Sequence, residues 1–215
     1  MNRILLTTSF LASAVLAGMS FVGAASAAPT YCSASDPNPD GLSTSDMTWE
    51  GGTASDCYGV VSGNPDYNAG AIFSNDWGIF DYLVKDGGNT TGTVGGVQFT
   101  LDADLNTDSG NWGLSWTEVG SPGLPITLDF VAILKGSDRY ASYLFEGITF
   151  SNADTSGSGS FDINFTNNGG QTPDLSHLSL FVRMAEVPVP EPGSLALLGL
   201  GLIGLRFARQ RSKAA

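Results

Sequence analysis

Between residues 47 and 184 the chain is divided into short segments of alternating hydrophobicity, and this pattern restricts its fold more than any other feature. The segment 160–165, Ser-Phe-Asp-Ile-Asn-Phe, alternates strictly between polar and apolar residues. Successive side chains of a β-strand point to opposite faces, so such a segment buries one face and leaves the other in water. No window of this region repeats apolar residues at a period of 3.6 over three helical turns. The pattern therefore predicts antiparallel β-structure.

Clusters of Gly, Asn, Asp and Pro separate these segments, as at 85–89, 106–110 and 166–170. About ten short strands at this spacing are typical of a β-sandwich. We therefore predict an all-β fold, an antiparallel β-sandwich of jelly-roll type. The predicted strands are 47–50, 58–62, 77–85, 97–103, 113–118, 126–135, 140–146, 147–151, 160–165 and 177–184.

The first 27 residues have the three parts of a secretory signal peptide. Arg3 supplies the positive charge, residues 4–22 are apolar, and Ala25-Ser26-Ala27 forms a cleavage site of small residues. We expect export and cleavage after Ala27. Residues 28–46 are rich in Ser, Pro, Asp and Gly, which predicts an irregular arm ahead of a sandwich domain at 47–186.

The charge of the exported part is strongly negative. Between residues 28 and 193 only four cations, Lys85, Lys135, Arg139 and Arg183, stand against all 21 Asp and Glu residues, a net charge of −17. Such a surface repels phosphate backbones, so we expect no nucleic-acid partner. The same charge keeps a secreted domain soluble and attracts divalent cations.

The two cysteines, Cys32 and Cys57, lie close together near the start of the exported part. In an oxidising compartment they should form a disulfide. Closing a loop of this length stabilises a fold by roughly 3 kcal/mol on the chain-entropy model. The alternative is a metal or catalytic thiol pair, which would need further ligands.

The C-terminal segment 187–215 has three parts in a fixed order. Pro190, Glu191 and Pro192 lie in a proline-rich hinge, residues 195–205 are uninterrupted apolar and small residues, and the end is basic. This segment resembles the PEP-CTERM sorting signal of Gram-negative bacteria, in which a Pro-Glu-Pro motif precedes a short hydrophobic helix and an Arg-rich terminus. Eleven helical residues are about 17 Å long, against a bilayer hydrocarbon core of about 30 Å.

The resemblance implies how the protein is sorted. The short apolar segment would be a hydrophobic helix that holds the chain in the inner membrane, with the basic end in the cytoplasm by the positive-inside rule. An exosortase-type enzyme would be the processing partner and would recognise Pro190, Glu191 and Pro192. After cleavage the domain would be found in the cell envelope or outside the cell.

Residues for chemistry are few. The chain has one histidine, His177, and its neighbour Ser176 would point to the opposite face of a strand, so we expect a structural histidine and no catalytic set. We expect no cofactor, with one alternative: Asp102, Asp104, Asn106 and Asp108 have the 1-3-5-7 spacing of a calcium loop. The loop lacks the bidentate Glu of that pattern, and its carboxylates could simply face water.

Two functions remain open. The first is a non-enzymatic envelope or extracellular-matrix protein associated with exopolysaccharide or biofilm. The second is a secreted carbohydrate-binding module or polysaccharide-active enzyme with a lectin-like sandwich, which would need a pair of carboxylates or a solvent-facing aromatic surface. The aromatic residues considered for such a surface are Trp77, Trp112, Trp116, Tyr82, Tyr140 and Tyr143. In a sandwich, however, aromatic residues belong more often to the core.

Overall fold

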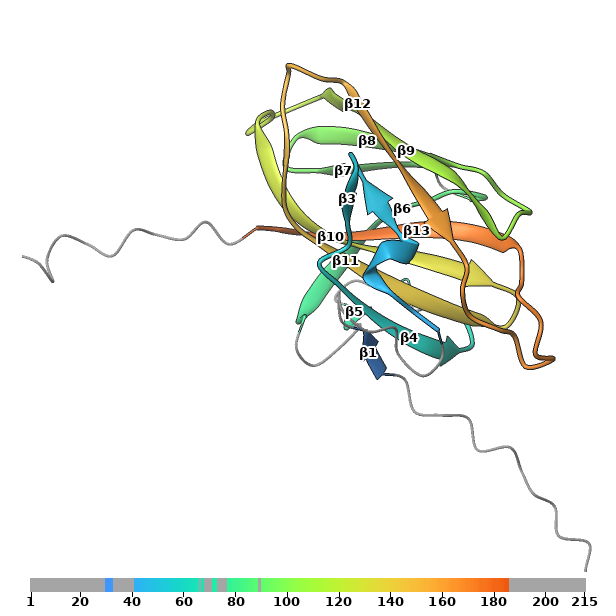
Figure 1. Cartoon of the computed structure of the whole chain (residues 1–215). Coiled ribbons are helices and arrows are strands. Elements are labelled where there is room, and N and C mark those ends of the chain that lie inside the picture. Colours follow the sequence, from blue (N-terminus) through green and yellow to red (C-terminus); the bar gives the residue numbers. More distant parts are fainter. Residues whose placement is uncertain are drawn as a thin grey trace, which may run out of the picture.

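The computed structural model describes residues 30–32, 41–65, 67, 71–72, 77–88 and 90–185. They form two antiparallel β-sheets packed face to face and one 3-10 turn, η1 (Thr44–Asp46), as Figure 1 shows. The predicted all-β antiparallel sandwich is therefore confirmed. The predicted signal peptide at 1–27 and the predicted C-terminal helix in 187–215 lie outside the described residues.

The larger sheet has seven strands in the order β1-β4-β11-β10-β13-β6-β5, and the smaller sheet has four in the order β12-β9-β8-β7. The larger sheet contains β1 (Thr30–Cys32), β4 (Asp56–Ser62), β5 (Ala71–Ile72), β6 (Ile79–Lys85), β10 (Ile126–Gly136), β11 (Arg139–Phe150) and β13 (Leu175–Met184). The smaller sheet contains β7 (Thr91–Val94), β8 (Val97–Ala103), β9 (Ser109–Glu118) and β12 (Ser156–Asp162). A separate hairpin joins β2 (Thr48–Trp49) to β3 (Gly52–Thr53).

The connections mix local and distant pairings. β7, β8 and β9 form a meander and β10 and β11 a hairpin, whereas β4 pairs with β11 and β6 pairs with β13. The last strand, β13, lies inside the larger sheet between β10 and β6. The sheets thus hold seven and four strands, whereas a jelly roll is built from eight.

Two differences from the predicted strands have local causes. The segments 140–146 and 147–151 were predicted as separate strands, but β11 continues through Gly147 across a β-bulge. Leu128 lies opposite Ile148 and Phe130 opposite Phe145, so two residues of β11 face one of β10 at this point. The second difference is β7, Thr-Gly-Thr-Val, which was not predicted because it holds a single large apolar residue.

The main core lies between the sheets. Along β8, Val97, Phe99 and Leu101 are buried and alternate with exposed residues. Their neighbours include aromatic rings from both sheets, with the Phe99 and Phe150 centroids 4.9 Å apart and those of Trp112 and Phe130 6.1 Å apart. Alternating burial along the smaller sheet therefore produces one continuous core.

A second apolar cluster covers the outer face of the larger sheet. We call it the outer-face cluster. Its buried members are Trp77, Phe80, Val131, Ile133, Leu144 and Phe181, and Tyr58, Tyr67, Tyr82 and Tyr140 pack against it half-buried. β10 is consequently buried on both faces over most of its length.

The segment 28–46, predicted as an irregular arm, contributes to the sandwich where it is described. Leu42 is fully buried, and the buried Asp46 at the end of η1 accepts hydrogen bonds from the Tyr143 hydroxyl at 3.1 Å and the Asn164 side-chain amide at 2.9 Å. Burial raises the pKa of Asp46, although its hydrogen bonds partly oppose that effect. The arm is thus held by polar contacts as well as by Cys32.

The sandwich has two ends with different contents. At one end, β13 stops at Met184, close to the β7–β8 turn at residues 95–96 and the β9–β10 loop at 119–125. We call this the exit end, because the chain leaves the domain there (left in Figure 1). The other end, which we call the distal end, contains the β10–β11 turn at 137–138 and the β8–β9 turn at 104–108.

Candidate functional site

The sorting motif follows the last described residue within a few positions. The last described residue is Ala185, whose backbone N–H donates to the carbonyl of Thr127 at 3.1 Å. Pro190, Glu191 and Pro192 follow outside the described residues. A membrane-crossing helix is not found in the part of the chain that the structure describes.

The predicted disulfide between Cys32 and Cys57 is confirmed. The two residues are directly opposite each other on β1 and β4, with their Cα atoms 5.1 Å apart and their sulfur atoms bonded. This Cα separation is usual for disulfides. Since β1 has three residues and lies at the edge of the sheet, the bond fixes a strand that few backbone contacts could hold.

The predicted calcium loop forms the β8–β9 turn at the distal end. Asp104 accepts a hydrogen bond from the backbone N–H of Asn111 at 2.8 Å, and Asp108 accepts one from the Ser109 hydroxyl at 3.3 Å. Asp102 and Asp104 border an open recess of about 240 Å³. In the described ranges, three or more His, Cys, Asp or Glu side chains are nowhere grouped to hold a metal ion. Calcium binding here stays a prediction.

His177 lies on the outer face of the larger sheet and pairs with Tyr67. Its Nε2 is 2.5 Å from the Tyr67 hydroxyl, which also accepts a hydrogen bond from the Ser179 hydroxyl at 3.3 Å. Burial, with the positive charges of Lys85 and Lys135, lowers the pKa of His177 to about 4. The imidazole is therefore neutral at pH 7. The residue is half-buried, and its structural role stays a prediction.

Two cations, Lys85 and Lys135, lie at this corner of the outer face. The Lys85 Nζ lies 5.1 Å from the centre of the Tyr67 ring, and the buried Lys135 donates to the carbonyl of Ser137. Burial lowers the pKa of Lys135, Asp138 raises it and Lys85 lowers it further. Within the described part, neither lysine forms an ion pair. The corner therefore combines two cations with the carboxylate of Asp138, in a domain that is acidic as a whole.

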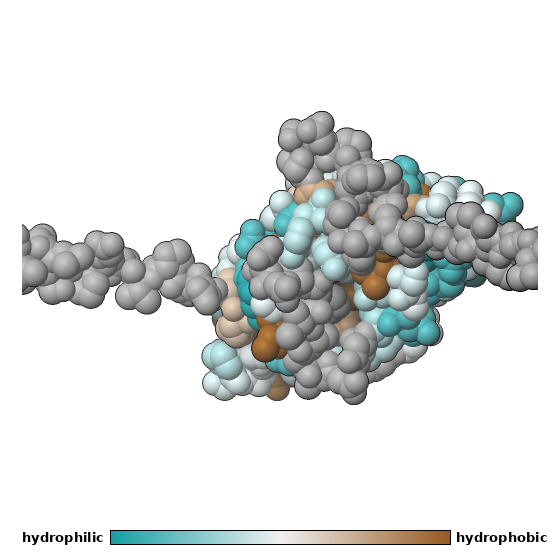
Figure 2. Space-filling model, turned by 90° about the horizontal axis from the view of Figure 1, so that it is seen from below, coloured by the Kyte–Doolittle hydropathy of each residue, from teal (hydrophilic) through white to brown (hydrophobic). Residues whose placement is uncertain are grey.

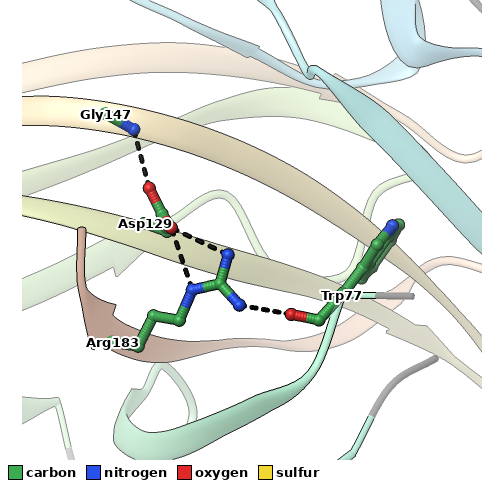
Figure 3. Close-up of polar contacts among 4 residues, drawn as sticks. All are labelled: Trp77, Asp129, Gly147 and Arg183. Atoms are coloured by element: carbon green, nitrogen blue, oxygen red, sulfur yellow. Dashed lines mark hydrogen bonds and ion pairs between the residues drawn. The ribbon is translucent and has the colours of Figure 1, made fainter. Parts of the chain in front are cut away.

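At the exit end of the same face, Arg183 is held by an ion pair and by hydrogen bonds. Its guanidinium pairs with the buried Asp129, with Nε and Nη2 at 2.9 and 2.8 Å from Oδ2, and also donates to the carbonyl of Trp77 (Figure 3). Asp129 Oδ1 accepts from the N–H of Gly147 at 2.8 Å, within the bulge of β11. The guanidinium carbon lies 4.4 Å from the Phe80 ring centre. Through these contacts the Asp129–Arg183 pair links β10, β11 and β13 to the residues just before β6. Its role is therefore structural.

The aromatic residues considered for a sugar-binding surface are mostly buried. Trp112 is 2% exposed, Trp116 is 6% exposed and Tyr143 is fully buried in the main core. Trp77 belongs to the outer-face cluster, where Tyr82 and Tyr140 are half-buried. The core interpretation thus holds for all but the two tyrosines, and these keep part of their rings at the surface.

A small pocket lies near the exit end between the two sheets. Its volume is about 220 Å³, and it is lined by Trp49, Glu50, Trp116, Ile148, Thr149, Phe150, Ser151, Asp154 and Ser156. The Trp116 Nε1 donates to the carbonyl of Ser151 at 3.0 Å, and Glu50 accepts from the N–H of Ser158 at 2.6 Å. Two carboxylates, hydroxyls and aromatic walls are the groups that bind a neutral sugar ring.

The sequence did not single out Glu50, Asp154 or Tyr67 as candidates. Glu50 and Gly51 form the two-residue turn of the β2–β3 hairpin, both with positive φ, of 48° and 79°. The sequence Glu-Gly-Gly is a usable signal for that turn. Tyr67 lies outside the strands and meets His177 across 110 residues, so periodicity alone could not have paired them.

A disulfide-linked sandwich followed by a proline hinge, an apolar segment and a basic end defines an exported protein with a sorting tail. The family model of the PEP-CTERM protein-sorting motif matches residues 188–212, which include Pro190, Glu191 and Pro192. The chain therefore carries a PEP-CTERM sorting signal, as predicted, and is sorted by an exosortase. The match covers the tail alone. No curated protein and no solved structure matches this chain.

Proposed function

We propose that this protein is a non-enzymatic component of the cell envelope or extracellular matrix. In this proposal it crosses the inner membrane, is held there by its apolar segment, is cleaved at the Pro-Glu-Pro signal and then associates with exopolysaccharide. The observation that carries the proposal is the sorting motif at 188–212, placed directly after a single sandwich domain.

The tail has the physical properties of a temporary anchor. Its uninterrupted apolar segment, residues 195–205, would be about 17 Å long as a helix, shorter than a hydrocarbon core of about 30 Å. Arg206, Arg209, Arg211 and Lys213 follow it and favour a cytoplasmic C-terminus. A segment that spans poorly suits a protein that is held briefly and then released.

The intact mass of the mature protein, purified from its host, tests the processing. We expect loss of the residues before Ala28 and of those after Pro192. A mature protein that still ends at Ala215 would overturn the sorting part of the proposal.

Matrix association needs a separate test. The protein should be recovered with the polysaccharide fraction of wild-type cells and in the culture medium of a strain that makes no exopolysaccharide. Recovery in the same fraction from both strains would contradict the association and leave the processing result untouched.

The pocket near the exit end favours a second candidate, a secreted carbohydrate-binding module. Glu50 and Asp154 offer carboxylate acceptors beside the wall formed by Trp116. Calorimetric titration with oligosaccharides from the host matrix tests it, with Asp154→Asn expected to weaken binding about tenfold, the cost of a lost charged hydrogen bond. Asp174→Asn, an exposed carboxylate outside the pocket, is the matched control. Equal affinities of the two variants would exclude the pocket.

A further inference from the structure

The exit end is held close to the membrane as long as the tail is uncut. Ala185 is the last described residue, and the uninterrupted apolar segment begins at Leu195, so nine residues, 186–194, connect them. Nine residues span at most about 30 Å when fully extended. This maximum length restricts only the distance between the domain and the membrane. It makes the exit end the part of the domain surface nearest to the lipid.

Exposed apolar side chains gather at this same end. Ile79, Val119 and Met184 are 57%, 55% and 54% exposed, respectively. The one other large hydrophobic residue with high exposure in the described part is Tyr31, at 38%, which lies on the edge strand β1. Single exposed apolar residues are ordinary, but three at one end of an acidic domain form a group that requires an explanation.

The three side chains come from neighbouring segments. The N–H of Val119 donates to the carbonyl of Gly96 at 2.8 Å, and a Cβ atom at Gly95 would lie 4.0 Å from the sulfur of Met184. The β6–β13 register places Val182 opposite Asp81, so Met184 and Ile79 face each other two residues further along. Figure 2 shows hydrophobic surface at the left end of the domain, where β13 ends in Figure 1.

We propose that the exit end rests on the outer surface of the inner membrane before cleavage, with Ile79, Val119 and Met184 in contact with lipid. This inference depends on the membrane-held state of the proposed function. Apolar side chains bind a bilayer surface in proportion to the area that they bury at the headgroup boundary. While the tail holds the domain at the membrane, the effective concentration of the exit end near the lipid is high. Three side chains are therefore enough for contact, although they would bind lipid only weakly if the domain were free.

Electrostatics does not favour the contact. Three of the four cations between residues 28 and 193, Lys85, Lys135 and Arg139, lie at the distal end, and Arg183 is engaged with Asp129. Carboxylates such as Glu118 occur near the exit end. The contact is therefore apolar, and added salt should not weaken it, because salt screens the repulsion between carboxylates and anionic lipid. Cutting the tail removes the tether and should release the domain from the surface.

The test uses the full chain in vesicles of phosphatidylethanolamine and phosphatidylglycerol. Cys32 and Cys57 are joined, so an introduced cysteine is the single free thiol. Ser121→Cys places an environment-sensitive fluorophore at the exit end, and Ser176→Cys places the same label at the distal end as the control. Lipids that carry a quencher near the headgroup should quench the first label several times more strongly than the second.

The matched variant is Ile79→Ser with Val119→Ser and Met184→Ser. It should lower the quenching of the Ser121→Cys label toward the level of the control, with the remaining difference due to the tether. It should leave the melting temperature of the domain nearly unchanged, because all three side chains are more than half exposed. Equal quenching at both ends, or quenching that the triple variant does not reduce, would overturn the proposal.

Other occupants of the exit end give different results, and each overturns the proposal. A blue shift of the Ser121→Cys label without lipid quenching, independent of protein concentration, would show that the chain's own tail covers these residues. A shift that grows with protein concentration would indicate a second copy. If flotation shows that the protein does not bind vesicles at all, the membrane-held state of the proposed function fails together with this contact.

Discussion

The outer faces of the two sheets differ in composition and in burial. On the larger sheet the outer-face cluster buries apolar and aromatic side chains, and cations lie at both ends of it. On the smaller sheet the outer face is exposed and consists mainly of hydroxyl and amide side chains: Gln98, Thr100, Asn111, Ser115, Thr117, Ser156 and Ser158. The sandwich therefore has a covered side and a wet side.

The difference shows that the larger sheet is built like an inner layer. Its central strand β10 has the sequence Ile-Thr-Leu-Asp-Phe-Val-Ala-Ile-Leu-Lys-Gly and is buried on both faces over most of its length. β8, in the smaller sheet, alternates between buried and exposed residues. A strand that is buried on both faces needs a nearly continuous apolar sequence, whereas a half-buried strand needs alternation. Four experiments test how far the two sides differ in stability.

The largest effect should come from Phe181→Ala in the outer-face cluster. Phe181 is fully buried, so truncation should cost about 3–5 kcal/mol of unfolding free energy, as in a main core. Thr117→Ala on the wet face should change the same quantity by less than about 0.5 kcal/mol. Urea unfolding measures both. A cost for Phe181→Ala near that of Thr117→Ala would mean that the covered side is not a true core.

The edge strands of the two sheets are held by different interactions, and removal of the disulfide is the second test. The edge strand β12 of the smaller sheet donates backbone hydrogen bonds to the side chains of Thr48 and Glu50, whereas β1 is held by the Cys32–Cys57 bond. Replacing both cysteines by serine should cost about 3 kcal/mol. The measurement is the urea midpoint. A reducing agent should destabilise the wild-type protein to a similar degree and leave the double variant unchanged.

A smaller effect is expected from Arg183→Leu at the exit end of the covered side. The change leaves the buried Asp129 without its cationic partner, but the Arg183 side chain is 32% exposed and solvent screens the pair. We expect a loss of about 1–2 kcal/mol. Arg139→Leu removes a half-buried arginine bonded to Asn168 and serves as the control, because Arg139 has no buried carboxylate partner among the described residues, with an expected change below about 0.5 kcal/mol. Equal losses of unfolding free energy in the two variants would show that the Arg183–Asp129 pair does not stabilise the domain.

The smallest effect concerns pH at the distal end of the covered side. The pKa of His177 is lowered from 6.5 to about 4, so between these values the unfolded chain binds more protons than the folded domain. Stability should therefore fall as the pH drops from about 6.5 toward 4. His177→Gln should reduce the difference between the urea midpoints measured at pH 7 and at pH 5. The raised pKa of Asp46 acts with the opposite sign and remains in both proteins, so the wild-type and variant profiles are compared directly.

Much of the fold could be predicted because the main signals are local. Alternation located β8 and the part of β12 around Phe161, and the continuous apolar sequence located β10. The joined β11 was missed because a bulge at Gly147 shifts the alternation by one residue, which makes one strand look like two. Local pattern thus identifies strands well and their continuity poorly.

The candidate sites depended on contacts that sequence cannot show. Tyr67 meets His177 across 110 residues, and Asp129 meets Arg183 across 54. The same limit applies to the pocket beside Trp116, whose lining comes from the β2–β3 turn, β9, β11 and the start of β12. The tail was different: its motif is contiguous, and residues 188–212 were recognisable from the sequence alone.

The position of β13 links the folding of the domain to its export. β13 is the last strand of the chain, yet it lies between β10 and β6 and supplies backbone partners to both. In the proposed route, in which the chain crosses the inner membrane from its N-terminus, β6 cannot join the sheet until residues 175–184 have crossed. By then the apolar segment that begins at Leu195 would have reached the bilayer. Completion of the larger sheet and arrival of the sorting signal would thus be nearly simultaneous, and the processing enzyme would meet a domain that is only then able to finish folding.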